Sequence, residues 1–127
     1  MKHIEVFNET KKVKITNGTF YHGSYFLTKD IKELKLPLWI TKSKLNAIHF
    51  SVSMKYDEVT KKNRFVGQQS DVTGYVYTLE ISNADIDEMK FNEFIINSGD
   101  IIINKIEEVK VSGSNSLVKL PKIIREI

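Results

Sequence analysis

The stretch Gly74-Tyr75-Val76-Tyr77-Thr78-Leu79-Glu80-Ile81 decides the fold of this chain, because apolar and polar side chains alternate along it. Alternate residues of a β-strand point to opposite faces of its sheet. One face would carry Tyr75, Tyr77, Leu79 and Ile81. The other would carry Val76, Thr78 and Glu80. We therefore predict a half-buried β-strand here, with the carboxylate of Glu80 exposed.

Downstream of this strand, two short apolar runs indicate further strands. Phe94-Ile95-Ile96 and Ile101-Ile102-Ile103 flank the segment Asn97-Ser98-Gly99-Asp100. Because Gly99 can adopt the positive φ of a tight reversal, this pattern predicts a β-hairpin. Residues 107–111 would extend its second strand.

Both ends of the chain carry similar signals. Residues 3–7 and 12–16 bracket Asn8-Glu9-Thr10-Lys11, which predicts another hairpin. After a turn signal at Asn17-Gly18, residues 20–24 are apolar and aromatic enough to form a strand. We expect a loop at 112–116 before a final segment at 117–127.

The best helical pattern lies between these strands. Its apolar residues, spaced as one stripe of a helix, are Leu45, Ile48, Val52, Tyr56 and Val59. Thr41 or Ser43 would cap the start of this helix, and Ala47 would let it pack close to the sheet. A shorter helix at 29–36 would end before Pro37, because proline disfavours helical geometry in the preceding residue. Together these elements predict an α+β fold with a mainly antiparallel sheet.

Composition limits the classes of protein to consider. With 127 residues, 41% of them hydrophobic, the chain has room for one domain with a modest core. It has no cysteine, which excludes disulfides and thiolate metal sites. A charged N-terminus and the lack of any apolar run of about 18 residues predict a cytoplasmic protein without a membrane segment.

Charge and histidine content add weaker limits. A net charge of +3 with a pI near 9.0 suits an anionic ligand but does not single out nucleic acid. Because His3, His22 and His49 are isolated from acidic residues at ligand spacing, we expect no metal site.

Three segments carry the candidate catalytic and ligand-binding residues. The first is Tyr21-His22-Gly23-Ser24, the second is Leu38-Trp39-Ile40-Thr41 followed by Phe50, and the third is Asn92-Glu93-Phe94-Ile95-Ile96. In this order they resemble the three short motifs of the ADP-ribosyltransferase superfamily, which binds NAD and breaks its bond to nicotinamide. The resemblance implies a single ADP-ribosyltransferase-like domain over residues 1–127, with a compact split antiparallel β-sheet and a few flanking helices.

The resemblance also implies a role for each motif. His22 would bond a ribose hydroxyl and Gly23 the nicotinamide carboxamide, with Tyr21 and Ser24 beside them. Trp39, Thr41 and Phe50 would bind the nicotinamide ring, held between the two aromatic side chains. Glu93 would act with His22 in catalysis, because departure of nicotinamide leaves a cationic ribose that a carboxylate stabilises. NAD would be consumed as a substrate, and no metal would be required.

The chain departs from part of that superfamily. Arginine-modifying members carry a second glutamate at the place of Phe91, so we expect another acceptor, with Met89 and Phe91 contacting it. The resemblance implies a bacterial or phage mono-ADP-ribosyltransferase that acts as a toxin or effector on a macromolecule, protein more than nucleic acid. An antitoxin or a host target protein would be its partner.

Several alternatives stay open on the sequence. Trp39 and Phe50 could be core residues, whereas the rival carboxylates Glu107 and Glu108 have the pattern of solvated charges. The same fold could support an NAD glycohydrolase, or a non-enzymatic inhibitor or binding module. Binding of nucleic acid by exposed aromatic and basic side chains is a weaker alternative.

Overall fold

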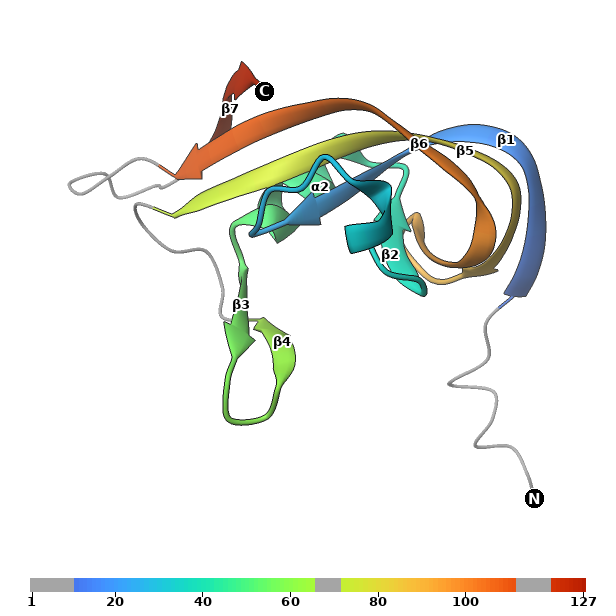
Figure 1. Cartoon of the computed structure of the whole chain (residues 1–127), viewed down its shortest axis with the longest axis horizontal. Helices are drawn as coiled ribbons and strands as arrows, with labels where there is room; N and C mark the ends of the chain where they lie inside the picture. Colours follow the sequence, from blue (N-terminus) through green and yellow to red (C-terminus); the bar gives the residue numbers. More distant parts are fainter. Residues whose placement is uncertain (1–10, 66–71, 112–119) are drawn as a thin grey trace.

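A computed structural model describes residues 11–65, 72–111 and 120–127 of the chain. Its main element is an antiparallel five-stranded sheet in the order β2-β1-β5-β6-β7 (Figure 1). These strands are β1 (Lys11–Ser24), β2 (Leu38–Thr41), β5 (Thr73–Glu88), β6 (Glu93–Val111) and β7 (Pro121–Glu126). The other elements are a 3₁₀ turn η1 (Ile31–Glu33), the helix α2 (Lys44–Ser51) and a ribbon of β3 (Met54–Asp57) and β4 (Lys62–Phe65). The predicted α+β class with a mainly antiparallel sheet is confirmed.

The strand predicted at 74–81 is confirmed and forms the middle of β5. Tyr77, Leu79 and Ile81 are completely buried, as their shared face predicts. Val76 is completely buried too, although the alternation places it on the opposite face. The reason is that α2 covers this opposite face, where Val76 packs with Ala47. Both faces of the sheet therefore carry a core.

The sheet curls and closes on itself through β2. One side of β2 pairs with β1 at Tyr21 and Thr41, and its other side pairs with β6 from Leu38 opposite Ile96 to Thr41 opposite Glu93. Strands β1, β5 and β6 bend together at one end of the molecule (Figure 1). The expected split sheet of an ADP-ribosyltransferase-like fold stays a prediction beside this closed arrangement. The larger core lies inside it, and its buried residues are Phe20, Leu34, Leu38, Ile40, Tyr77, Leu79, Ile81, Ala84, Ile86, Phe94, Ile96 and Ile106.

The hairpin predicted around residues 97–100 is wrong, because β6 continues through that segment. Strand β5 pairs with β6 on both sides of it, and bulges between Ser82 and Ile86 accompany the bend. Gly99 has φ +147, and a Cβ added there would lie 2.7 Å from the Cβ of Ala84. Glycine therefore serves the close approach of two bent strands. The real reversal follows β5, where Phe91 and Asn92 both have positive φ.

The turn predicted at Asn17-Gly18 is also wrong. Strand β1 runs through both residues and pairs with β5 from Lys11 to Ser24. The strands predicted at 12–16 and 20–24 are thus parts of one long strand. The other half of the predicted N-terminal hairpin, residues 3–7, and the predicted loop at 112–116 lie outside the described residues.

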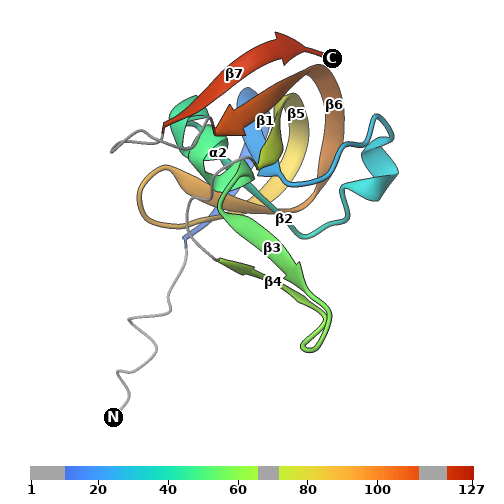
Figure 2. The same cartoon turned by 90° about the vertical axis from the view of Figure 1, so that its left-hand side faces the viewer.

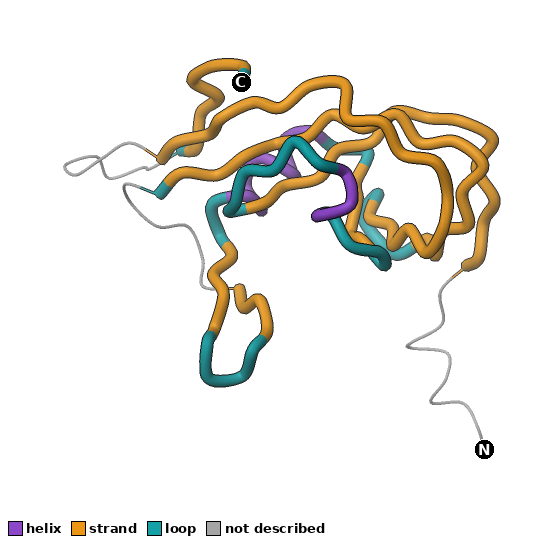
Figure 3. Tube along the Cα trace, viewed as in Figure 1, coloured by secondary structure: helices purple, strands orange, loops and turns teal. Residues whose placement is uncertain are grey.

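The long helix predicted from one apolar stripe is wrong, since α2 ends at Ser51 and the chain continues into β3 (Figure 3). Leu45 is 62% exposed and Val59 is 90% exposed, so neither belongs to a buried stripe. Of the two predicted caps, Thr41 and Ser43, Ser43 caps α2: its hydroxyl accepts a hydrogen bond from the backbone N–H of Asn46 at 3.1 Å. The helix expected at 29–36 is reduced to η1. No helix within the described ranges has the length and apolar content needed to cross a membrane.

Two glycines allow α2 to pack directly on the sheet. A Cβ added at Gly23 would collide with the carbonyl oxygen of Ala47, and one added at Gly74 would lie 2.5 Å from the carbonyl oxygen of Ser51. Ala47 and Ser51 are the buried residues of the helix, which agrees with the role predicted for Ala47. Beyond α2, the β3–β4 ribbon projects away from the sheet in both views (Figure 2).

Candidate functional site

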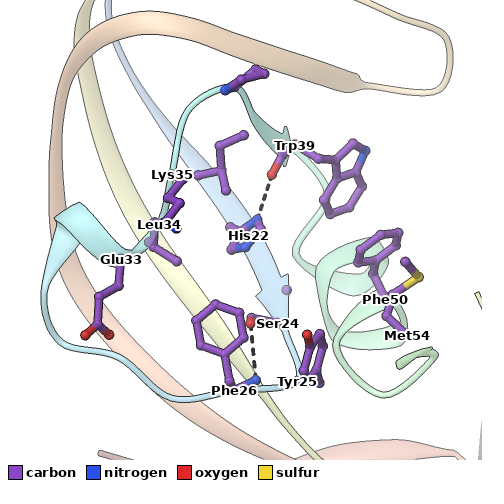
Figure 4. Close-up of a pocket in the computed structure, with 13 residues that line it drawn as sticks. His22, Ser24, Tyr25, Phe26, Glu33, Leu34, Lys35, Trp39, Phe50 and Met54 are labelled. Atoms are coloured by element: carbon purple, nitrogen blue, oxygen red, sulfur yellow. Dashed lines mark hydrogen bonds between the residues drawn. The ribbon is translucent and has the colours of Figure 1, made fainter. Parts of the chain in front are cut away.

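A cavity of about 330 Å³ opens where the end of β1 meets β2 and α2 (Figure 4). It contains five of the predicted site residues, namely His22, Gly23, Ser24, Trp39 and Phe50. Tyr21, Thr41 and Glu93 are not among its lining residues. The cavity therefore brings together residues of the first motif and the aromatic residues of the second. The carboxylate of the third motif, Glu93, does not line it.

His22 is a buried polar residue of the cavity. Its Nδ1 lies 2.7 Å from the carbonyl oxygen of Trp39 (Figure 4). Because a carbonyl oxygen can only accept, Nδ1 is the protonated ring nitrogen and donates this hydrogen bond. Burial lowers the pKa of His22 from its usual 6.5 to about 4, although the hydrogen bond to Trp39 opposes the shift. The imidazole is therefore neutral at pH 7, and its Nε2 is a hydrogen-bond acceptor.

Trp39 and Phe50 form an aromatic pair at the cavity wall. Their ring centroids are 4.3 Å apart and the planes are inclined by 20°, which is a stacked arrangement. A heterocycle held between the two rings would need the rings to be separated by about twice the contact distance of ~3.5 Å. The expected sandwich of nicotinamide between the rings is therefore not present in this arrangement, because the two side chains already contact each other.

Glu93 lies behind Trp39, at the start of β6. The indole Nε1–H of Trp39 donates a hydrogen bond to Oε1 of Glu93 at 2.9 Å. Tyr21, Thr41 and Glu93 are partners in one row across β1, β2 and β6, so their side chains share a face that the neighbouring His22 does not. Trp39 thus connects the two predicted catalytic residues: its carbonyl binds His22 and its indole binds Glu93.

Thr41 and Tyr21 have structural contacts instead of a place in the cavity. Thr41 is completely buried, and its hydroxyl donates to the carbonyl oxygen of Asn92 at 2.9 Å and accepts from the N–H of Ser43 at 3.0 Å. It thereby joins the β5–β6 turn to the start of α2. Tyr21 packs against the apolar cluster beneath α2.

Gly23 and Ser24 line the cavity but also have local roles. The absence of a side chain at Gly23 is required by the contact with α2, which explains this glycine without a ligand. The hydroxyl of Ser24 accepts a hydrogen bond from the backbone N–H of Phe26 at 3.2 Å, as a serine at a turn often does (Figure 4).

Sequence reasoning missed the segment 25–37, which forms much of the cavity wall. Tyr77 holds this segment to the sheet: its hydroxyl donates to the carbonyl oxygen of Phe26 at 3.0 Å and accepts from the N–H of Thr28 at 2.9 Å. The ring of Tyr77 also lies 5.9 Å from that of His22. A buried tyrosine hydroxyl requires hydrogen-bond partners. The predicted burial of Tyr77 was therefore the one sequence signal that another segment must pack over this part of β5.

The rival carboxylates Glu107 and Glu108 are buried, which corrects their interpretation as solvated charges. Adjacent residues of a strand point to opposite faces, so the two glutamates have different partners. Glu107 forms an ion pair with Lys44 of α2 at 2.7 Å, and Glu108 forms one with Arg125 of β7 at 2.5 Å. These pairs attach α2 and β7 to β6.

Comparisons of the chain with protein-family models, with curated proteins and with solved structures find no match. Among the residues that the structure describes, no three His, Asp or Glu side chains are grouped as ligands of a metal ion.

Proposed function

We propose that the chain is a mono-ADP-ribosyltransferase, with an ADP-ribosyltransferase-like fold, that transfers ADP-ribose from NAD to a macromolecular acceptor. The observation that supports this best is the neutral His22 in a cavity with aromatic walls. Because its Nδ1–H is committed to Trp39, Nε2 can accept a hydrogen bond from a ribose hydroxyl. Trp39 and Phe50 offer flat apolar surface to the attached heterocycle.

The size of the cavity suits one half of the substrate. About 330 Å³ is at the lower end of the range for small-molecule sites, roughly 300–1,000 Å³. This favours nicotinamide with its ribose inside the cavity and the remainder of NAD outside it. Since Trp39 and Phe50 stack on each other, nicotinamide would lie against the cavity side of this pair.

In the proposed reaction, the bond between ribose C1′ and the pyridinium nitrogen breaks, and its electron pair moves to that nitrogen. Nicotinamide leaves as a neutral molecule and the ribose remains as a cation. A nucleophile of the acceptor then forms a bond to C1′ and gives its proton to the Glu93 carboxylate. Glu93 requires a change of the Trp39 side chain for this role, because the carboxylate is bonded to the indole and does not line the cavity.

The surroundings of Glu93 are compatible with a macromolecular acceptor. The turn that precedes it exposes Phe91 to 80% and Met89 to 43%, an unusual display of large apolar side chains. Such side chains favour a protein as the acceptor. We propose a role as a toxin, effector or phage factor that acts in the cytoplasm of the producing or host cell, with an antitoxin or host protein as partner.

One observation favours a second function, that of a non-enzymatic binding module on the same fold. Glu93 and His22 point to opposite faces of the sheet, and the Glu93 carboxylate is not a lining residue of the cavity. If Trp39 keeps its position when a ligand binds, the Glu93 carboxylate does not reach the ribose. The cavity would then bind its ligand without cleaving it.

The test incubates the protein with NAD labelled in its adenylate group and a bacterial lysate, and follows nicotinamide release and labelled macromolecules. Glu93→Gln is the informative variant, because its amide oxygen can still accept from the Trp39 indole while the charge is lost. We expect it to abolish labelling and to retain NAD binding, whereas Glu58→Gln, an exposed carboxylate, should behave as wild type.

Each result of that assay assigns a function. Label in macromolecules with the wild type, lost in Glu93→Gln, supports the transferase. Release of nicotinamide without label indicates an NAD glycohydrolase. Binding of NAD without either signal supports the binding module, and no binding of NAD would refute the proposal. His22→Ala should weaken NAD binding, and unchanged affinity would remove His22 from the site.

A further inference from the structure

A second groove adjoins the cavity, on the other side of the segment that follows η1. Its volume is about 450 Å³. One wall comes from residues 31–36 and the other from the bend of β6 at residues 99–102. Leu34 and Lys35 line both this groove and the cavity of His22. The two spaces are therefore neighbours separated by two residues.

The groove combines an apolar wall with two kinds of charge. Ile102 is 63% exposed and Leu36 is 41% exposed, so the groove offers apolar surface that the fold leaves uncovered. Asp100 adds a carboxylate, and of its two oxygens only Oδ2 accepts from a described side chain, the amide of Asn83 at 3.2 Å. Lys32 and Lys35 are exposed, and neither pairs with an acidic side chain in the described ranges.

We propose that this groove binds the adenosine half of NAD, with the pyrophosphate crossing over Lys35 and within reach of Lys32. This inference rests on the proposed function of the neighbouring cavity. The cavity has room for nicotinamide and its ribose only, so the rest of the dinucleotide must leave it. Leu34 and Lys35 line both the cavity and the groove, so a ligand that passes over them extends from one space into the other. The Lys35 side chain supplies positive charge for a pyrophosphate at this point.

The chemistry of the groove matches adenosine in two respects. The flat adenine base has apolar faces, and Ile102 and Leu36 provide a surface against which it can lie. A carboxylate accepts hydrogen bonds and cannot donate them, so Asp100 suits the ribose hydroxyls or the exocyclic amine of adenine. The same carboxylate would repel a phosphate, which orients the pyrophosphate toward the lysines.

The experiment measures the affinities of NAD and of nicotinamide mononucleotide, which lacks the adenosine, by calorimetry. We expect the wild type to bind NAD at least about tenfold more tightly. Ile102→Ser should reduce the affinity for NAD about five- to tenfold and leave the affinity for the mononucleotide unchanged. Ile124→Ser is the matched control, because Ile124 is a similarly exposed isoleucine on β7 and outside the groove.

Two further results separate this inference from the proposed function. If NAD and the mononucleotide bind equally well, or Ile102→Ser weakens both alike, the groove does not hold adenosine and the nicotinamide cavity is retained. If neither ligand binds the wild type, both proposals are refuted. Lys35→Gln should weaken both ligands, since each carries a phosphate that lies near Lys35, and unchanged affinities would refute the path across Lys35.

Discussion

Replacing Tyr77 with phenylalanine tests whether one hydroxyl holds the cavity wall to the sheet. The ring of Tyr77 is completely buried and phenylalanine fills the same space, so the change removes only the hydroxyl. That hydroxyl makes both hydrogen bonds to the segment 25–37, to Phe26 and to Thr28. Burial raises the pKa of Tyr77, which keeps the hydroxyl protonated and able to donate at neutral pH.

The expected cost follows from what the two partners lose. Thr28 is buried, and a buried N–H without an acceptor costs about 1–3 kcal/mol. Phe26 is 38% exposed, so water can replace the lost donor at its carbonyl at a cost of about 0.5–1 kcal/mol. A total of about 1.5–4 kcal/mol should lower the melting temperature of the 127-residue chain by about 6–15 °C, given an unfolding entropy of about 2.1 cal/mol/K per residue.

The assay combines thermal unfolding with amide hydrogen exchange. We expect the Thr28 amide to exchange at least about tenfold faster in Tyr77→Phe, with little change in the strands of the core. Tyr75→Phe is the matched control, because Tyr75 lies two residues away on β5 and its hydroxyl has no hydrogen-bond partner in the described part of the chain. Equal melting temperatures and equal exchange at Thr28 in the two variants would refute the role of this hydroxyl.

Three further predictions follow from other contacts. Gly23→Ala should destabilise the fold by about 2–4 kcal/mol in urea unfolding, because its Cβ would collide with the backbone carbonyl of Ala47 in α2. Gly18→Ala should cost less, because the atom nearest to its Cβ is a ring carbon of Phe20 at 3.0 Å; equal costs would contradict the role of Gly23 in helix packing. The pKa of His22 falls from 6.5 to about 4 on folding, so the unfolded chain binds the proton first, and the free energy of unfolding should be full above pH 6.5 and decrease by about 3 kcal/mol between pH 6.5 and 4. A His22→Gln variant with the same pH dependence of unfolding would show that another group titrates. Lys44→Met leaves Glu107 buried without its cation and should cost about 1–3 kcal/mol, while Glu107→Gln in the same variant should restore most of this in chemical unfolding; a double variant as unstable as the single one would exclude a charge effect.

Much of the fold class could be predicted from local pattern, whereas the turns could not. Alternation from Gly74 to Ile81 identified a strand correctly, since it depends only on the local two-residue period of a strand. The same reasoning placed reversals at Asn17-Gly18 and around Gly99, where the strands continue. The reversal occurs at Phe91 and Asn92, because pairing along the full length of β5 and β6 outweighs the preference of a phenylalanine for negative φ.

The candidate site was predicted in part. His22, Gly23, Ser24, Trp39 and Phe50 do meet around one cavity, and Glu93 does lie beside Trp39. The sequence could not predict that Thr41 and Tyr21 serve packing instead, or that segment 25–37 supplies the opposite wall. Those facts depend on the pairing of β2 with both β1 and β6, which are far apart along the chain.

The sequence by itself determined the antiparallel α+β class, a helix cap at Thr41 or Ser43 and the set of chemically reactive or ligand-binding candidates, since each depends on side-chain type and spacing over a few positions. Only the tertiary structure decided that the sheet closes through β2, that Gly23 admits α2, and that Trp39 separates His22 from Glu93. The physical reason is that these features arise from contacts between distant segments. Burial of apolar surface and the pairing of backbone hydrogen bonds across the whole sheet select them, and no local pattern encodes that sum.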